Sequence, residues 1–237
     1  MNDALDAFPA ARKWPPQHPE RLQLYSKPTP NGVKPAIMLE ETGLPYEVHR
    51  VAFEREEQHS PEYLALNPNN KIPAIIDPNG PGGRPLALWE SIAILQYLAE
   101  KTGKLAPTDA AGRHETTQWL LFQAAGIGPM FGQVGFFMMS DAKDWEDKRP
   151  RDRYVQESRR LLNVLEGRLA GRAWIMGDDY TIADIATFPW INALFALPGA
   201  DALVGTSAFP EVKRVLDAFL ARPAVARGLK IPPAPEA

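Results

Sequence analysis

The pattern of apolar and polar positions divides the chain into a strand-rich first part and a helix-rich second part. Short runs at residues 21–26, 46–51, 74–76 and 86–89 have the length and apolar content of β-strands. From about residue 110 onward, apolar residues recur instead at the three- and four-residue spacing of helices. The pattern therefore predicts two regions of different secondary structure.

Helices are predicted between the strands of the first part. Residues 33–42 have an apolar face and are followed by Gly43, a residue that commonly ends helices. Ser60 followed by Pro61 has the form of an N-cap and first turn. A third helix begins at Glu90–Ser91 and ends near Gly103. The resulting order is β-α-β-α-β-β-α, which is thioredoxin-like and has about the size of a small domain.

The second part is predicted to be helical almost throughout. Residues 118–125 belong to a long helix, and the glycines and proline in 126–133 predict a kink in it. Amphipathic helices follow at 150–169 and 209–220. Thr181 and Asp184 have the spacing of a capping box at a helix start, which gives both a structural role.

The two ends of the chain are rich in proline. Residues 1–20 contain four prolines among polar residues and predict an extended arm, which either wraps the body or a partner subunit or is a frayed tail. The predicted domains are therefore the arm at 1–20, an α/β domain at 21–104 and a helical domain at 109–230.

Composition excludes several classes of protein. The net charge is -3 and the basic residues are scattered, which argues against nucleic acid as a partner. No apolar run in the sequence approaches the length of a membrane span, and the acidic N-terminus lacks the features of a secretory signal. The chain has no cysteine, and its four histidines lack metal-ligand spacing, so we expect no disulfide, cysteine nucleophile or metal site. The cytoplasm is the expected location.

The most informative stretch runs from residue 67 to residue 91. Pro73 stands between a polar loop and a buried strand, where a cis Ile72–Pro73 bond is plausible. Such a turn leaves the N–H and C=O of Ile72 free to pair with an extended peptide. Glu90–Ser91 open a helix, whose start attracts a carboxylate. The stretch thus offers a backbone edge for a peptide beside a site for its terminal carboxylate.

This combination resembles the glutathione site of the glutathione transferase family, in which a cis-proline precedes the third strand and an acidic residue and a serine open the third helix. The helical second part with its buried capping box fits the same family. The pattern Thr29-Pro-Asn-Gly-x-Lys34 resembles the bacterial nu class, as do Gln58, residues 68–73 and Gly128-Pro-Met-x-Gly-Gln133. The resemblance covers roughly residues 21–225.

The resemblance implies a fold with an α/β thioredoxin-like N-terminal domain and an all-α C-terminal domain. It also implies that glutathione is a substrate or a bound ligand. Two glutathiones, or glutathione disulfide, would occupy a site between the domains of a homodimer. The implied function is glutathione-dependent disulfide-bond reduction, with some peroxidase activity in the class. The alternatives are conjugation of glutathione to electrophiles and a non-catalytic glutathione-binding regulatory module. Other partners would be small thiols, disulfides or electrophiles.

The resemblance implies that the thiol of glutathione is activated by a group that follows the first strand. The candidates are Thr29 and Asn31, whose hydroxyl and amide, with the helix start at Gly32, are hydrogen-bond donors that favour a thiolate. Both are also ordinary turn residues. Tyr25 or Ser26 could act instead, as tyrosine and serine do in other classes, but their place within the strand favours packing roles.

The resemblance assigns further residues to glutathione. They are Gln58, Lys71, Ile72, Pro73, Glu90, Ser91, Gln133 and Arg153. Gln58 and Lys71 would bind the glycine end, Glu90 and Ser91 the γ-glutamyl end, and Arg153 the glutathione of the neighbouring subunit. Some have a simpler interpretation: Gln58 and Lys71 as exposed loop residues, Glu90 and Ser91 as an ordinary helix start, and Arg153 as a solvated arginine.

Overall fold

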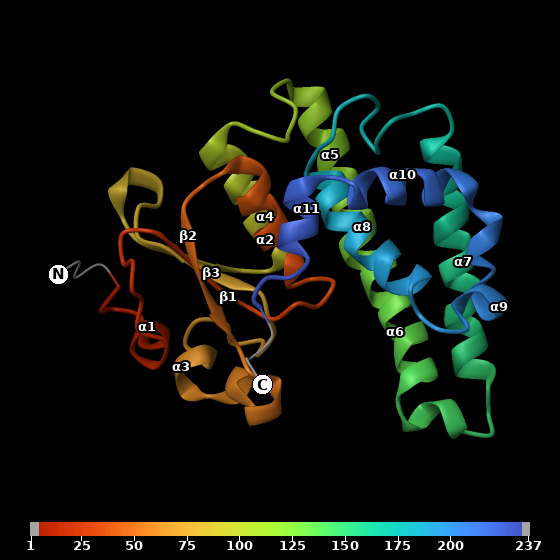
Figure 1. Ribbon diagram of the computed structural model, residues 1–237, viewed down its shortest axis with the longest axis horizontal. Coiled ribbons are helices and arrows are strands. Elements are labelled where there is room, and N and C mark those ends of the chain that lie inside the picture. The colour runs from red at the N-terminus through yellow and green to blue at the C-terminus, as the bar shows by residue number, and fades with distance from the viewer. Residues whose placement is uncertain (1–4, 234–237) are drawn as a thin grey trace. The chain divides into compact units, whose positions relative to one another are not determined.

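The structure is a computed structural model that describes residues 5–233 (Figure 1). The chain forms two compact units. The first contains the chain up to Lys104 and the segment from Pro223 onward, and the second contains Leu105–Arg222. The first unit is α/β and the second is built from helices, which confirms the predicted fold class.

The first unit contains a four-stranded mixed sheet in the order β2-β1-β3-β4. The strands are β1 (Leu22–Ser26), β2 (Tyr46–Arg50), β3 (Ala74–Asp77) and β4 (Leu86–Trp89). β1 is parallel to β2 and antiparallel to β3, with Leu24 opposite Ile75. Because β1 and β3 run in opposite directions, the end of β1 and the start of β3 lie at the same end of the sheet.

Helices cover both faces of this sheet (Figure 1). Side chains alternate between the faces along a strand, so Tyr25 and Ile76 face the cluster that holds α1 (Pro9–Lys13) and α3 (Pro61–Leu64). The other face packs against α2 (Val33–Thr42) and α4 (Ser91–Thr102), which contact each other. All five residues of β1 are buried, as expected for a strand covered on both faces.

Local sequence signals set the ends of these helices as predicted. Gly43 and Gly103 follow α2 and α4 in the left-handed region, with φ of 71° and 65°. Ser60 is the N-cap of α3, and its hydroxyl accepts a hydrogen bond from the Tyr63 N–H. Glycine fits the left-handed position because it has no Cβ to clash with the backbone.

The N-terminal segment differs from the extended arm that the prolines predicted. Residues 1–4 lie outside the described residues, but Pro9–Lys13 form helix α1, and its Ala10 and Ala11 are buried against the sheet. The ring of Trp14 packs edge-on against Tyr25, with 5.7 Å between ring centroids. The described part of the segment thus packs on the body, one of the two alternatives, but it contains a helix that short-range sequence patterns did not indicate.

The C-terminal helix α11 (Pro223–Gly228) belongs to the first unit, not to the helical region at 109–230 where the sequence placed it. It packs on α2 so closely that a Cβ on Gly228 would lie 2.7 Å from Ile37 Cα. Arg227 Nε also donates to a carboxylate oxygen of Glu40 at 2.5 Å. The chain thus returns to its first unit after completing the second.

The second unit is a set of packed helices. They are α5 (Ala110–Phe122), η4 (Gln123–Ile127), α6 (Gly128–Met139), η5 (Asp141–Asp144), α7 (Arg149–Leu169), α8 (Ile182–Phe195), α9 (Ala200–Val204), η6 (Thr206–Ala208) and α10 (Pro210–Leu220). The η4 segment is a π-helical turn that joins α5 to α6 without a break in helical structure. A kink was predicted near 126–133, and the structure has a π-helical turn at Gln123–Ile127, which changes the backbone hydrogen bonding without ending the helix.

The continuous helix Ala110–Met139 is long and apolar enough to cross a membrane by length and composition. Polar residues such as His114, Glu115 and Gln118 interrupt it, so the sequence contains no unbroken apolar run of that length. The core helix of a soluble protein passes the same test, so this one helix is weak evidence of a membrane span. Its buried Leu120, Ile127 and Val134 pack within the second unit, where α5 contacts α8 and α6 contacts α7.

A capping box opens α8 inside this unit. The Asp184 carboxylate accepts from the N–H groups of Thr181 and Ile175, each at 2.9 Å, and the Thr181 hydroxyl accepts from the Ala183 N–H at 3.2 Å. Burial raises the pKa of Asp184 to about 7, and the donated hydrogen bonds act in the opposite direction. Asp184 thus provides a hydrogen-bond acceptor for a backbone N–H group at the start of a buried helix and also fixes the preceding loop at Ile175.

The close approach of α11 to α2 yields a stability prediction. Gly228→Ala should lower the free energy of unfolding by about 1–3 kcal/mol, because its methyl group would overlap Ile37. Gly167→Ala, at an open position of α7, should instead raise it by roughly 0.5–1 kcal/mol. Urea unfolding followed by circular dichroism measures both, and equal midpoints for the two variants would contradict the close contact.

Candidate functional site

The loop between β1 and α2 is tightly folded around Gly32. A Cβ at this position would lie 1.9 Å from the Lys27 carbonyl oxygen and 2.9 Å from Ile72 Cδ1, so only glycine fits. The Ser26 hydroxyl donates to the Gly32 carbonyl at 2.9 Å. The loop is therefore held at the end of β1 and lies directly against Ile72.

Thr29 occupies the middle of this loop and is half-buried. Its hydroxyl oxygen accepts from the Gly32 N–H at 3.2 Å, and its carbonyl accepts from the Val33 N–H at 3.0 Å. A hydroxyl that accepts one hydrogen bond still has its own proton to donate. Thr29 thus serves the turn and remains able to donate to a ligand, so its two predicted roles are compatible. Asn31 is the next half-buried polar residue, and its carbonyl accepts from the Lys34 N–H at 3.4 Å.

Tyr25 and Ser26 are poorly placed to activate a thiol. Both are fully buried. Burial raises the pKa of the Tyr25 hydroxyl, which disfavours a phenolate. The Ser26 hydroxyl is engaged with the Gly32 carbonyl. These two residues follow the packing interpretation.

The Ile72–Pro73 bond is cis, as predicted. The preceding residue is anchored through its carbonyl, since the Lys71 oxygen accepts from the Tyr63 hydroxyl at 2.8 Å and from the Asn67 amide at 2.6 Å. Among the described residues, the Ile72 N–H and C=O make no hydrogen bond. They form an open backbone edge beside the Thr29 loop. The Lys71 side chain is exposed.

Glu90 and Ser91 lie at the start of α4. Glu90 has a φ of 75°, a region that L-residues rarely adopt and that costs on the order of 1–3 kcal/mol. Strain of this kind persists where the surrounding structure imposes it, often at ligand sites. Ser91 is buried as the first residue of the helix, where backbone N–H groups attract an anion.

Lys34 was absent from the predicted site, although it closes the motif that begins at Thr29. Its side chain is only 1% exposed, and its ammonium donates to the Ser91 hydroxyl at 3.3 Å. Burial lowers the pKa of Lys34 to about 7, and the charge of Glu90 acts in the opposite direction. Lys34 therefore joins the start of α2 to the start of α4.

Gln58 lies in the short helix η2 (Glu57–His59), which contacts α3. Its side-chain oxygen is buried and has no hydrogen-bond partner among the residues that the structure describes. Buried acceptors without a partner are uncommon in folded proteins. An unsatisfied amide beside α3, which also anchors Lys71, fits a residue that meets a ligand.

Gln133 and Arg153 belong to the second unit, whereas the residues above belong to the first. Both are exposed. The Arg153 guanidinium lies 3.7 Å from Glu157, one turn further along α7. That weak ion pair matches the solvated alternative for Arg153.

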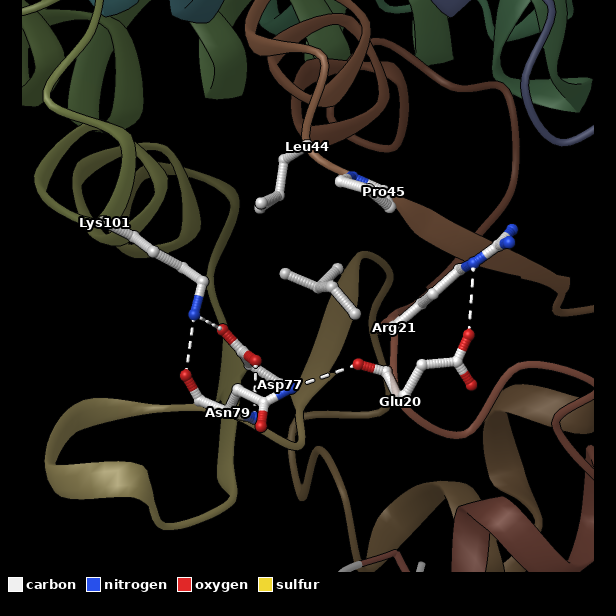
Figure 2. Close-up of a pocket in the computed structure, with 8 residues that line it drawn as sticks. Glu20, Arg21, Leu44, Pro45, Asp77, Asn79 and Lys101 are labelled. Atoms are coloured by element: carbon white, nitrogen blue, oxygen red, sulfur yellow. Dashed lines mark hydrogen bonds and ion pairs between the residues drawn. The ribbon is translucent and has the colours of Figure 1, made fainter.

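A cavity of about 330 Å³ lies at the other end of the sheet, between the start of β1 and the end of β3 (Figure 2). Its charged groups pair with one another. Lys101 Nζ lies 2.8 Å from the Asp77 carboxylate and donates to the Asn79 carbonyl at 2.7 Å, while Arg21 lies 3.4 Å from Glu20. None of the predicted site residues lines this cavity, and the contacts of Lys101 with Asp77 and Asn79 hold the loop after β3.

Within residues 5–233, no group of His, Asp or Glu side chains is arranged to hold a metal ion.

Comparison with known proteins identifies the family. The glutathione S-transferase N-terminal domain matches residues 20–100, and the C-terminal domain of the same family matches residues 128–223. The chain belongs to the glutathione S-transferase family. The predicted family resemblance is thereby confirmed.

Several relatives are similar over most of their length. Disulfide-bond oxidoreductase YfcG of Escherichia coli is 41% identical, over 88% of this chain and 94% of the relative. A glutathione transferase from Burkholderia graminis is 64% identical with a TM-score of 0.97, over 99% and 98% of the two chains, and has two glutathione molecules bound per subunit. One from Pseudomonas putida, 64% identical with a TM-score of 0.94 over 96% and 99%, has one glutathione disulfide bound per subunit.

The surroundings of two buried tyrosines yield a second prediction. Tyr25→Phe should leave stability unchanged or raise it by up to about 1 kcal/mol, because the Tyr25 hydroxyl is buried without a partner among the described residues. Tyr63→Phe, the matched control, should cost about 0.5–1.5 kcal/mol, because it removes the hydrogen bond to the Lys71 carbonyl. Thermal unfolding of both variants tests the difference, and a larger loss in Tyr25→Phe would contradict it.

Proposed function

We propose that this transferase is a glutathione-dependent disulfide-bond reductase. The observation that carries the proposal is the grouping in the first unit of a donor loop at Thr29 and Asn31, an open backbone edge at Ile72 and an anion-attracting helix start at Ser91. Glutathione is a short peptide with one thiol and a carboxylate at each end. The edge receives its backbone, the start of α4 receives its γ-glutamyl carboxylate, and the thiol faces the donor loop.

The donors at Thr29 and Asn31 stabilise the thiolate of glutathione. A free thiol has a pKa of about 8.5, and each unit by which hydrogen bonding lowers it corresponds to about 1.4 kcal/mol. The Thr29 hydroxyl oxygen accepts a hydrogen bond from the Gly32 N–H, which orients the hydroxyl. Its own proton can then point toward the sulfur. Gln58 contacts the glycine end, and Lys71 contributes a positive charge there.

The reaction consumes two glutathiones. The bound thiolate attacks one sulfur of a substrate disulfide, which releases a thiolate and forms a mixed disulfide with glutathione. A second glutathione thiolate attacks this intermediate, releasing the second substrate thiol and forming glutathione disulfide. Overall, one disulfide and two glutathiones yield two thiols and one glutathione disulfide. The chain has no cysteine, so the second glutathione performs the resolving step.

The Asn31→Ala variant tests the role of the donor loop. We expect kcat/KM for reduction of a small disulfide, coupled to glutathione reductase and NADPH, to fall about 10- to 100-fold, because one charge-assisted hydrogen bond to the thiolate is lost. Tyr25→Phe is the matched control and should keep full turnover. Full activity in Asn31→Ala together with a loss in Tyr25→Phe would instead favour tyrosine activation.

The same assay separates the alternative functions. Conjugation uses the same thiolate. If the wild-type protein conjugates glutathione to an aromatic electrophile but does not reduce disulfides, its function is glutathione conjugation. Wild type that binds glutathione and catalyses neither reaction would be a binding module. The similarity to YfcG, whose name states disulfide-bond oxidoreductase activity, favours reduction.

We also propose that the protein is a nu-class homodimer of the cytoplasm. The class rests on the motif from Thr29 to Lys34, and the location on the reduced glutathione pool that the reaction requires. The dimer is supported by large apolar side chains left exposed in the second unit, Phe136, Met139 and Trp145. In a dimer, Arg153 would contribute to the glutathione site of the neighbouring subunit, and Gln133 is proposed as a further glutathione contact.

Light scattering and one pair of variants test the dimer. The mass in solution should be twice the 26.3 kDa of one chain. Arg153→Ala should lower turnover about tenfold, as expected for loss of a charge-assisted contact to a ligand, whereas Arg160→Ala, on the same helix and also paired with Glu157, should not. A monomeric mass, or equal effects of the two variants, would refute the proposed role of Arg153.

A further inference from the structure

Lys34 is one of the largest fully buried side chains of the protein. Lysine is rarely buried to this degree, because the ammonium group loses its hydration. One of its contacts is to a neutral group, the Ser91 hydroxyl at 3.3 Å. The energetic cost of burying this lysine suggests that its charge serves a purpose other than packing.

The position of Lys34 is electrostatically unusual. It is the second residue of α2, and its ammonium contacts the first residue of α4. Helix starts carry a partial positive charge and favour anions, whereas lysine is favoured at helix ends. A buried ammonium beside two helix starts therefore adds to the positive potential that these starts present to a bound anion.

The neighbouring charge does not remove this effect. Glu90 acts to raise the pKa of Lys34, but burial outweighs it and lowers the pKa to about 7. The Glu90 side chain is exposed, so water screens its charge. An anion bound at the start of α4 would lie beside Ser91, one hydroxyl away from the buried ammonium.

We propose that Lys34 is a specificity-determining positioning residue that makes the start of α4 selective for the γ-glutamyl carboxylate of glutathione. Lys34 orients the Ser91 hydroxyl by donating to its oxygen, so that the hydroxyl proton is free for the ligand. Its protonated ammonium also adds positive charge to the partial charges of the two helix starts. Because it is buried, it acts through Ser91. The inference rests on the proposed binding of glutathione.

The test compares two ligands that differ only in this carboxylate. Glutathione and 4-aminobutanoyl-cysteinylglycine, which lacks the α-carboxylate, are titrated by calorimetry into wild type and Lys34→Met. We expect Lys34→Met to weaken glutathione binding by about 10- to 100-fold and binding of the analogue by less than about threefold. A role confined to folding or packing would weaken both ligands equally.

Two further variants complete the experiment. Lys34→Gln keeps a donor for Ser91 without the charge and replaces Lys34→Met in the comparison if the latter does not fold. Lys101→Met removes the lysine paired with Asp77 at the other end of the sheet and should leave both affinities unchanged (Figure 2). Equal losses for the two ligands, or no loss for either, in the Lys34 variants would overturn the inference. Wild type that binds neither ligand would refute the proposed function itself.

Discussion

The close contact between Gly32 and the Lys27 carbonyl is the constraint on which the candidate site depends. With no side chain at Gly32, the chain turns from β1 into α2 within a few residues and comes to rest against Ile72. That turn sets the direction of the Thr29 hydroxyl through the Gly32 N–H. It also sets the first turn of α2, from which Lys34 reaches Ser91. A wider loop would separate the donor loop from the backbone edge.

The antiparallel pairing of β1 with β3 determines where chemistry can occur on the sheet. It brings the loop after β1 and the cis Ile72–Pro73 turn before β3 to the same end. At the opposite end, Asp77 and Lys101 satisfy each other and hold a loop. At the end with the cis turn, the Ile72 N–H and C=O make no hydrogen bond among the described residues, and we propose that the ligand binds there. The cavity at the opposite end is lined by none of the proposed site residues.

The absence of cysteine and the burial of Tyr25 narrow the chemistry to hydrogen-bond donation. The protein has no thiol of its own, so in the proposed reaction it binds the thiol of glutathione and raises the fraction of it that is ionised. Neutral donors suit this task, because they stabilise an anion without forming a tight ion pair that would lower its reactivity. The buried ammonium of Lys34 lies beside Ser91, where we propose that a carboxylate of the ligand binds.

The sequence by itself determined the features that depend on a few neighbouring residues. The strands, the helix ends at Gly43 and Gly103, the cap at Ser60, the capping box at α8 and the cis bond at Pro73 all follow from local backbone and side-chain chemistry. The motif around Thr29 and Asn31 likewise pointed to the family and to the donor loop.

Only the tertiary structure decided how distant segments complete the first unit and its site. The docking of α1, the return of α11 onto α2, the Tyr63 anchor on Lys71 and the contact of Lys34 with Ser91 join residues far apart in the chain. Their pairing depends on packing against a common core, which residue spacing does not encode. The same reason explains why Lys34 stood inside the recognised motif without being assigned a role: its burial, not its position in the sequence, makes its charge significant.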